Sequence, residues 1–367
     1  MIGCSQLLFA IALSRFLPLV LALIATAALY VATTLRFTAQ MRDRPRPRFV
    51  TRFVDAPLFW HFGASTFMLV SSPLCSALAL LVGLFEGATV GGVFVIWRVG
   101  VGVSYALGLL VAAWAIWVER RLVQIRRLSV AVANLPPEFE GYTIAQLSDL
   151  HVGSFDPKER ALEWVALANA LDPDLAVVTG DLVTSGGGFY RDAADAIAAL
   201  RAKDGVFVTT GNHDLHQEAE LVRLIRERGP VVLQNDSRAI RRGNAALVVA
   251  GMEAKRADPK DVKRTLRGQP EGAPIVLLSH YPTSFEAAVE AGADLVLTGH
   301  THGGQLGIPF LSQRLNFARL TNQRSRGPVY AGKTMMYVNA GLGTTGPPMR
   351  LAVPPEIALF TLHRARC

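Results

Sequence analysis

The first third of the chain consists of long apolar runs with few charged residues. One run covers residues 7–35, and a second apolar region covers residues 56–118, in which Glu86 and Arg98 are the only charged positions. A helix needs about 20 apolar residues to cross a bilayer, so both stretches are long enough. The first run also exceeds the roughly 7 to 15 apolar residues of a signal-peptide core, which favours a retained anchor over a cleaved signal peptide.

Two helices joined by a short turn fit the second apolar region best. Two serines followed by Pro73 could mark a break within its first half, so three tightly turned helices are the alternative. In the N-terminal run we expect the span to start just after Arg15, whose side chain would reach an interface. The pattern therefore predicts three spans, or four if the chain breaks at Pro73.

From about residue 142, short apolar runs alternate with amphipathic segments. Short apolar runs bounded by turns indicate strands, whereas a period of 3.6 residues indicates helices. Such alternation predicts an α/β fold with stacked sheets. The predicted strands cover residues 143–147, 175–179, 206–209, 274–279 and 295–298, and the predicted helices cover residues 157–171, 191–202 and 218–228.

The composition agrees with this division of the chain. Only 18% of the 367 residues are charged, and the mean hydropathy of +0.31 is too high for an ordinary soluble protein. We therefore expect an all-α transmembrane region of about three helices at residues 1–118, a linker at residues 119–140, and a globular α/β domain at residues 141–367. The lipid bilayer is the first expected partner.

The net charge of +8 comes largely from arginines beside the apolar segments, so we expect no nucleic-acid partner. The positive-inside rule places both arginine-rich flanks in the cytoplasm, which requires an even number of crossings between them. Three spans and a cytoplasmic α/β domain satisfy this rule, whereas four spans would put the domain outside. The flanking arginines are Arg42, Arg44, Arg46, Arg48, Arg52, Arg120, Arg121, Arg126 and Arg127.

Each predicted strand of the α/β domain ends in a polar cluster. Ligands collect at the carboxyl ends of strands in α/β sheets, and five of the eight histidines fall in these clusters. Carboxylate, amide and imidazole groups in this combination suit Mn, Fe or Zn better than Mg alone. The candidate metal ligands are Asp149, His151, Asp181, Asn212, His280, His300 and His302.

The clusters can also be written as motifs. They are DLH at residues 149–151, GD at 180–181, GNHD at 211–214, a histidine at 280 and GHTH at 299–302. This set resembles the calcineurin-like metallophosphoesterase superfamily over residues 142–362. The continuation of GHTH into Gly303, Gly304 and Gln305 resembles its bacterial membrane-associated branch. The resemblance implies a metallophosphoesterase α/β sandwich, here in a multi-pass protein of the bacterial inner membrane.

The resemblance also implies two divalent metal ions, with Asp181 bridging them. Two cations about 4 Å apart would offset the charge of a phosphodiester and lower the pKa of a bound water, so that hydroxide is available at neutral pH. One metal would be held by Asp149, His151, Asp181 and His302, and the other by Asp181, Asn212, His280 and His300.

Three further residues are candidates for direct roles. The resemblance makes His213 the residue that protonates the leaving oxygen, with a structural histidine as the alternative, and Asp214 could orient its imidazole. Arg350 could reach the substrate phosphate, and a simple turn at the glycines before it is the alternative. The loop at residues 311–330 carries Arg314, Arg319, Arg324 and Arg326 and is either a substrate clamp or a solvated basic loop.

The sequence thus predicts a membrane-anchored dinuclear hydrolase of phosphoesters that works by attack of a metal-bound hydroxide. A phosphodiester or pyrophosphate of a lipid-linked or nucleotide substrate is expected, because a tethered site lies near lipid headgroups. The branch that the sequence resembles includes enzymes that cleave the pyrophosphate of UDP-diacylglucosamine. The alternatives are a catalytically inactive metal-binding scaffold and a membrane sensor on the same fold.

Overall fold

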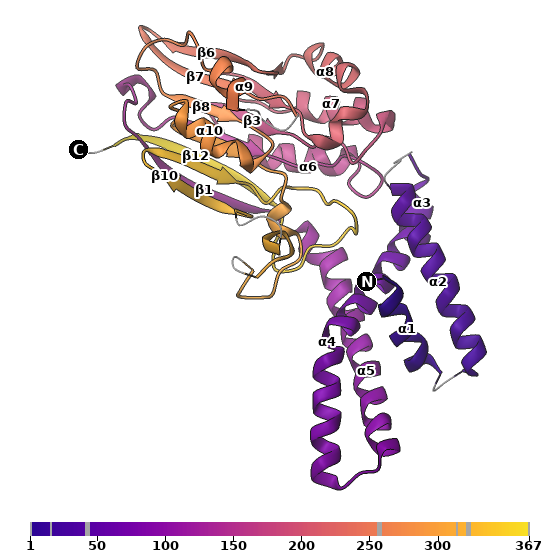
Figure 1. Ribbon diagram of the computed structural model, residues 1–367. Helices are drawn as coiled ribbons and strands as arrows, with labels where there is room; N and C mark the ends of the chain where they lie inside the picture. The colour runs from indigo at the N-terminus through magenta and orange to yellow at the C-terminus, as the bar shows by residue number, and fades with distance from the viewer. Residues whose placement is uncertain are drawn as a thin grey trace. The chain divides into compact units, whose positions relative to one another are not determined.

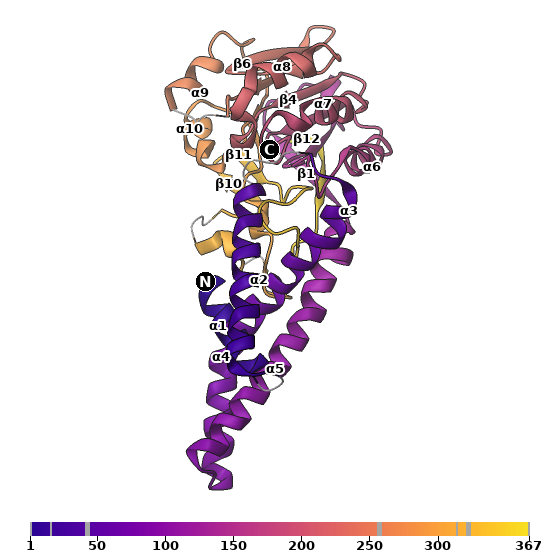
Figure 2. The same ribbon diagram turned by 90° about the vertical axis from the view of Figure 1, so that its right-hand side faces the viewer.

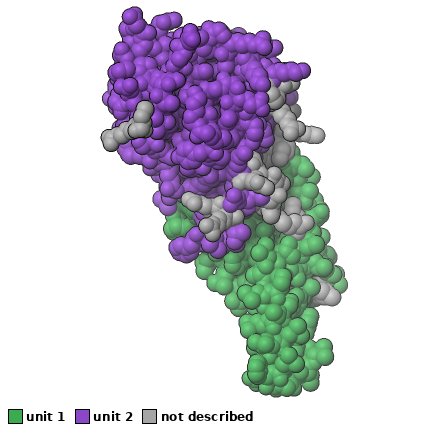
Figure 3. Space-filling view, turned by 60° about the vertical axis from the view of Figure 1, so that its left-hand side comes forward, with its two compact units in different colours: residues 1–40, 46–119, 347–349 green, residues 41–45, 120–346, 350–367 purple. Residues whose placement is uncertain are grey.

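The computed structural model describes residues 2–14, 17–40, 45–254, 259–312, 315–320 and 324–365. The chain forms two compact units, coloured separately in Figure 3. The helical unit comprises Met1–Gln40, Arg46–Glu119 and Pro347–Met349, and the α/β unit comprises Met41–Pro45, Arg120–Gly346 and Arg350–Cys367. Arg15, Arg42, Arg44 and Arg314, for which roles were predicted, lie outside the described residues.

The helical unit contains three segments that are long and apolar enough to cross a membrane, which is the predicted number. They are Val20–Ala39, Arg48–Glu86 and Val90–Arg121. The helices of this unit are α1 Ile2–Leu13, α2 Leu19–Gln40, α3 Arg48–Val50, α4 Ala56–Glu86 and α5 Val90–Ala113, with short π-helical turns at Thr51–Asp55 and Trp114–Val118.

Helix α4 continues through Pro73, so the alternative of a break there is not realised. Proline lacks the amide hydrogen that would otherwise bond the carbonyl of Leu69. The hydroxyl of Ser72 donates to that carbonyl at 2.8 Å instead. The helix ends at Glu86, where Gly87 adopts a left-handed conformation with φ 61°. Thr89 then begins α5 by accepting a hydrogen bond from the amide of Gly92.

The α/β unit is built from two stacked six-stranded sheets with helices on both outer faces (Figures 1 and 2). This confirms the predicted stacked α/β class. In order across the first sheet the strands are β1 Gln124–Val132, β12 Glu356–Arg364, β2 Thr143–Leu147, β3 Leu175–Thr179, β4 Val206–Thr209 and β5 Val231–Val232. In the second sheet they are β10 Gly327–Ala331, β11 Thr334–Val338, β9 Leu295–Thr298, β8 Ile275–Leu278, β7 Ala245–Gly251 and β6 Asp236–Arg242.

Three apolar layers hold these sheets and helices together. The layer between the sheets includes Val177 and Val249. The outer face of the first sheet packs through residues such as Val178 against α6 Lys158–Asn169, α7 Tyr190–Ala198 and α8 Glu218–Arg226. The outer face of the second sheet packs through residues such as Leu277 against α9 Pro259–Thr265 and α10 Phe285–Glu290. Strands buried on both faces read as continuous apolar runs, as these do in the sequence.

Residues 119–140, predicted as a linker, instead contribute an edge strand. Strand β1 pairs in parallel with β12, from Gln124 opposite Glu356 to Val132 opposite Arg364. Its first four residues are exposed, which hides the strand pattern in the sequence. The partner strand lies more than 200 residues away in the chain, so only the tertiary fold creates this pairing.

The parallel strands carry the polar clusters to one place. Strands β2, β3 and β4 run parallel in the first sheet, and β7, β8, β9 and β11 run parallel in the second. The carboxyl ends of parallel strands share an edge. The clusters after β2, β3, β4, β8 and β9 therefore meet at one end of the two sheets.

Candidate metal centre

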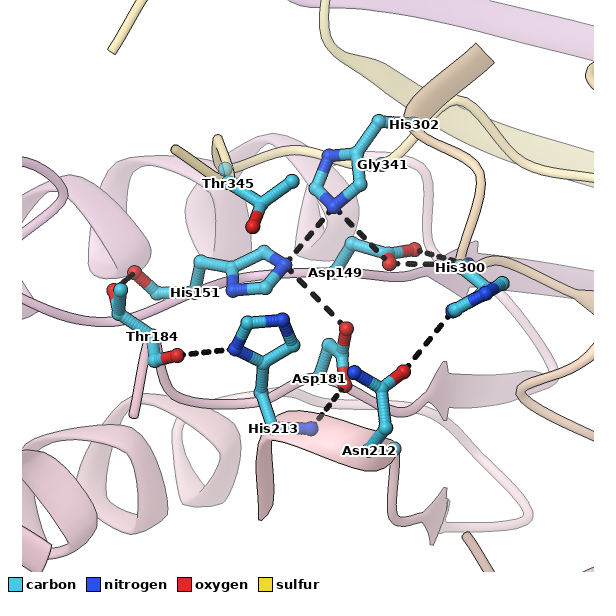
Figure 4. A network of polar contacts seen from close by, with 12 residues as sticks. Asp149, His151, Asp181, Thr184, Asn212, His213, His300, His302, Gly341 and Thr345 are labelled. Atoms are coloured by element: carbon cyan, nitrogen blue, oxygen red, sulfur yellow. Dashed lines mark hydrogen bonds and ion pairs between the residues drawn. The ribbon is translucent and has the colours of Figure 1, made fainter. Parts of the chain in front are cut away.

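The structure brings all seven predicted ligands together at the carboxyl ends of five strands. Figure 4 labels all of them except His280. Two groups of ligand atoms form, and within each group all atoms lie within 4.8 Å of one another. Asp181 belongs to both groups. The first group is Asp149, His151, Asp181 and His302, and the second is Asp181, His280 and His300.

The first group is buried and its side chains converge on one point. The Nε2 atoms of His151 and His302 lie 2.9 Å apart. The same nitrogens lie 3.6 Å from Asp181 Oδ2 and 3.5 Å from Asp149 Oδ1, respectively. Two imidazole nitrogens and two carboxylates directed at one point could hold a cation.

The second group takes in the predicted amide ligand. Asn212 Oδ1 lies 3.1 Å from His280 Nε2 and 3.0 Å from His300 Nδ1. Asp181 Oδ2 lies 3.3 Å from the same His280 nitrogen. The other ring nitrogen of His280 donates to the carbonyl of Thr179 at 2.9 Å. This hydrogen bond holds the ring so that Nε2 is directed into the group.

Most of these ligands have an unusual backbone conformation. Asp149, His151, Asp181, His300 and His302 all have positive φ, between 44° and 71°. Left-handed conformations are unfavourable for residues other than glycine and are concentrated at functional sites. Backbone hydrogen bonds between neighbouring strand ends hold two of them here, because Asp149 donates to Gly180 and His151 donates to Asp181, each at 3.0 Å.

Two motif glycines are required by close packing at the site. A side chain at Gly211 would place its Cβ 2.2 Å from Asp181 Oδ1, and one at Gly299 would place it 2.3 Å from Asp149 Oδ2. No other residue fits at either position without displacing a carboxylate of the centre. The glycines of GNHD and GHTH therefore serve the ligands rather than the turns alone.

The electrostatics of the first group fit a bound cation. Burial lowers the pKa of His151 to about 3 and the pKa of His302 well below its ordinary value, so both imidazoles are neutral and able to coordinate. Burial acts to raise the pKa of Asp181, but His280 and His151 hold it well below its usual range, so Asp181 is ionised. Neutral imidazoles and carboxylates are the forms that bind metal.

The surroundings of His280 also favour a positive charge at the site. Although burial lowers the pKa of this imidazole, the carboxylates of Asp181 and Asp149 raise it to about 9. Without a metal, this histidine therefore carries a proton that offsets the charge of the carboxylates. A metal ion would take the place of that proton.

Two hydrogen bonds orient Asp149, one from a residue outside the ligand set and one from the backbone of a ligand. The hydroxyl of Ser148 donates to Asp149 Oδ2 at 2.6 Å, and the amide of His300 donates to Oδ1 at 3.0 Å. Burial nevertheless raises the pKa of Asp149 to about 6. The sequence analysis missed Ser148 because a serine beside a motif has no distinguishing signature.

His213 lies beside the first group, with its ring 4.7 Å from the ring of His151 (Figure 4). Its Nδ1 donates to the carbonyl of Thr184, and its amide donates to Asp181 Oδ1 at 2.9 Å. With Nδ1 engaged, Nε2 is the ring nitrogen left to interact with another group. The Thr184 carbonyl could not have been found by motif, because every residue carries a backbone carbonyl.

The predicted role of Asp214 in orienting that imidazole is wrong. Asp214 is fully buried, and its carboxylate accepts from the amides of Leu182, Val183 and Gly211 at 2.7 to 3.2 Å. As the third residue of the 3₁₀-helix Asn212–Gln217, Asp214 points back to the start of that helix. It therefore ties the GNHD turn to the GD turn, and burial raises its pKa to about 8.

Arg350 does not face a substrate, contrary to prediction. Its side chain is fully buried. The guanidinium donates to the carbonyls of Ala340, Gly341, Gly343 and Val353 at 2.6 to 3.2 Å. A buried guanidinium with this many carbonyl partners holds the loop at residues 340–343 in shape.

Two arginines of the basic loop form ion pairs within the protein. Arg326 pairs with the buried carboxylate of Glu356 at 3.4 Å, and Arg324 pairs with Glu286. Arg319 is exposed. Of the described loop arginines, Arg324 and Arg326 therefore have roles in holding the loop to the rest of the unit.

Comparisons with known proteins agree with the motifs. Residues 142–304 match a family model described as calcineurin-like phosphoesterase. The chain is 30% identical over 260 residues to a transmembrane protein with metallophosphoesterase domain from Danio rerio, and this match covers 65% of the chain and 57% of that protein. It is 27% identical over 256 residues to the uncharacterized metallophosphoesterase YkuE of Bacillus subtilis, covering 68% of the chain and 88% of that protein.

The coverage of these matches differs between relatives. The chain spans only 57% of the length of the Danio rerio protein and 57% of a Bos taurus protein of the same name. Among solved structures, that of an archaeal phosphodiesterase is 12% identical, covers 54% of this chain and 84% of its own, and has a TM-score of 0.31. A likeness of that size carries no conclusion about activity.

Proposed function

We propose that the chain is a membrane-anchored dinuclear metal hydrolase of phosphoesters, built on the calcineurin-like phosphoesterase family whose model matches residues 142–304. One observation carries the proposal. Two groups of ligand atoms share a single carboxylate, that of Asp181. A shared carboxylate between two sets of imidazole and oxygen donors is the arrangement that holds two cations about 4 Å apart.

The residues present fit two divalent ions rather than one. The first set would be Asp149, His151, Asp181 and His302, and the second would be Asp181, Asn212, His280 and His300. The histidine content favours Mn, Fe or Zn over Mg. Such ions supply positive charge that offsets the phosphate and lowers the pKa of a water molecule at the site.

His213 completes the chemistry as the acid. Its Nδ1 donates to the Thr184 carbonyl, so a protonated ring presents the Nε2 proton to the leaving oxygen. A positioned acid of this kind accelerates a reaction by roughly 10² to 10⁴. The amide of His213 also donates to Asp181, which couples the position of the acid to that of the bridging carboxylate.

The substrate we propose is a phosphodiester or pyrophosphate, lipid-linked in preference to a soluble nucleotide. Three candidate spans precede the α/β unit, and the arginines on both flanks of the second apolar region favour a cytoplasmic site. A hydrolase confined in this way meets membrane phosphates at high local concentration.

Metal analysis and hydrolysis assays on the purified chain test the proposal. We expect close to two divalent ions per chain, and turnover of a generic phosphodiester that is lost with a chelator and restored by Mn, Fe or Zn. Asp181→Asn should lose both metal and activity, whereas His216→Ala, outside the ligand groups, should keep both. Metal binding at the expected stoichiometry without turnover of phosphodiesters, phosphomonoesters or pyrophosphates would favour the inactive scaffold.

A further inference from the structure

A loop that follows the GHTH motif exposes a cluster of large apolar side chains. We call residues 307–312 and 315–316 the apolar loop. In it Ile308 is 52% exposed, Phe310 105%, Leu311 48% and Leu315 50%. Among the described residues of the α/β unit, the other exposed large apolar side chains are scattered: Leu122, Ile125, Leu167, Leu215 and Tyr330. Single exposed apolar residues are ordinary, but a cluster indicates an interaction site.

Phe310 stands out within the apolar loop. It has φ 65°, in the left-handed region that is unfavourable for a bulky side chain. Its side chain is also fully exposed, so folding gains nothing from burying it. A residue with neither a conformational nor a packing reason in the folded unit is explained by a contact outside it.

The apolar loop has an ordered base. The amide of Ile308 donates to the carbonyl of Leu315 at 3.1 Å, and the amide of Leu315 donates to the carbonyl of Leu311 at 2.7 Å. The buried side-chain amide of Asn316 donates to the carbonyl of Ser312 at 2.8 Å. Backbone groups that are bonded internally can enter an apolar medium at less cost than open ones. The loop is thus built to present its side chains without exposing these polar groups.

We propose that the apolar loop inserts into the lipid bilayer that holds the three candidate spans. The third span ends at Arg121 and strand β1 begins at Gln124, so the connection between them reaches at most about 10 Å. The tether keeps the α/β unit at the membrane and gives the loop a high effective concentration there.

A bilayer fits the loop better than a protein partner does. A stable protein interface buries on the order of 1,200 to 2,000 Å² with aromatic and polar contacts, and a few side chains on one loop do not supply that area. A loop that is already tethered needs only to place a few apolar side chains below the headgroups. The exposed Arg319 follows in the chain, and its charge suits anionic headgroups.

Insertion would also act on the candidate metal centre. The loop follows the 3₁₀-turn His302–Gly304 directly. A Cβ at Gly304 would lie 2.6 Å from Asn316 Oδ1, so the turn that carries His302 packs closely on the base of the loop. Bilayer contact at Phe310 would thus bring this end of the sheets to the headgroup region. The insertion itself does not depend on the proposed hydrolase activity.

Fluorescence of the full chain in lipid nanodiscs tests the insertion. Starting from a variant with Cys4, Cys75 and Cys367 replaced by serine, Phe310→Cys carries an environment-sensitive NBD label. The matched control is the same label on Leu167→Cys, an exposed apolar position on helix α6. We expect blue-shifted NBD emission at position 310, quenched by lipids with doxyl groups on their acyl chains at least threefold more than at position 167.

Equal quenching at the two positions would overturn the proposal. Blue-shifted emission at position 310 that depends on protein concentration and ignores the lipid quencher would also overturn it, and would assign the loop to a second copy of the chain. The thermal unfolding midpoint of each labelled variant should match that of its parent, because neither side chain is buried. Phosphodiester turnover and metal content are measured in parallel, so that failure of the proposed hydrolase activity is distinguished from failure of insertion.

Discussion

His213 is the residue whose loss separates metal binding from chemistry. Its side chain contacts the Thr184 carbonyl rather than belonging to either ligand group. We expect His213→Ala to keep the metals and lose on the order of 10² to 10⁴ in turnover of a phosphodiester. Metal content and kcat on the same preparation check this. Asp181→Asn, by contrast, should lower the metal content, and its turnover should be lost together with the metal.

The leaving group gives the control for this assignment. If His213 donates a proton to the leaving oxygen, the loss of rate should be largest for poor leaving groups and small for p-nitrophenolate, which needs no proton. Full turnover of a poor leaving group by His213→Ala would show that another group is the acid.

Arg350 should behave as a structural residue. Its guanidinium is fully buried and bonded to carbonyls of the loop at residues 340–343. Removing it leaves several carbonyls without donors, each of which costs about 1 to 3 kcal/mol when buried. We expect Arg350→Ala to lower the thermal unfolding midpoint of the full chain in detergent strongly. Arg350→Lys should restore little of that loss in the midpoint. A stable Arg350→Ala protein with only a raised KM would instead support substrate binding.

At the scale of elements, Arg120 joins segments that are distant in sequence. Its Nη2 donates to the carbonyl of Phe155 at 2.6 Å and to Asp156 Oδ1 at 3.0 Å. Thr344 donates to the other oxygen of Asp156 at 3.4 Å. The loop after β2, which follows His151, is thus tied within the α/β unit both to Arg120 and to Thr344.

Breaking this pair should be costly because both partners are buried. Loss of one member of a buried ion pair costs about 3 to 5 kcal/mol, so Arg120→Ala should lower the free energy of unfolding of the α/β unit by about 3 kcal/mol. The neighbouring Arg121 is exposed, so Arg121→Ala is the matched control and should change little. Adding Asp156→Asn to Arg120→Ala should recover part of the loss. Equal effects of the two arginine substitutions would contradict this role.

At the scale of the whole molecule, the charge pattern predicts which side of the membrane holds the α/β unit. Three spans with arginine-rich flanks place the C-terminus in the cytoplasm. A C-terminal alkaline phosphatase fusion in a bacterial host should therefore be inactive, and a green fluorescent protein fusion should fluoresce. Active alkaline phosphatase at this position would put the unit outside.

Substrate preference is also a property of the whole molecule. If tethering selects membrane phosphates, kcat/KM for a lipid-linked pyrophosphate in mixed micelles should exceed that for its deacylated, water-soluble analogue. Each acyl methylene buried in the membrane stabilises binding by about 0.8 kcal/mol. The difference in kcat/KM between the two substrates should therefore be large. Equal constants for the two substrates would leave a general phosphoesterase.

The sequence by itself determined the features that depend on short stretches of chain. Strands β2, β3, β4 and β9 have the predicted bounds, because each is an apolar run that ends in a motif. The seven predicted ligands lie together, because parallel strands deliver their carboxyl ends to one edge. The number of candidate spans follows from the same local pattern.

Tertiary structure alone decided what depends on distant neighbours. Strand β1 was hidden because its partner β12 lies at the other end of the chain. The directions of Asp214 and Arg350 depend on which carbonyls and amides surround them, and the Thr184 carbonyl has no residue signature. Motif spacing fixes which side chains reach a strand end. Packing of the whole fold fixes whether a side chain there faces the centre or holds the backbone around it.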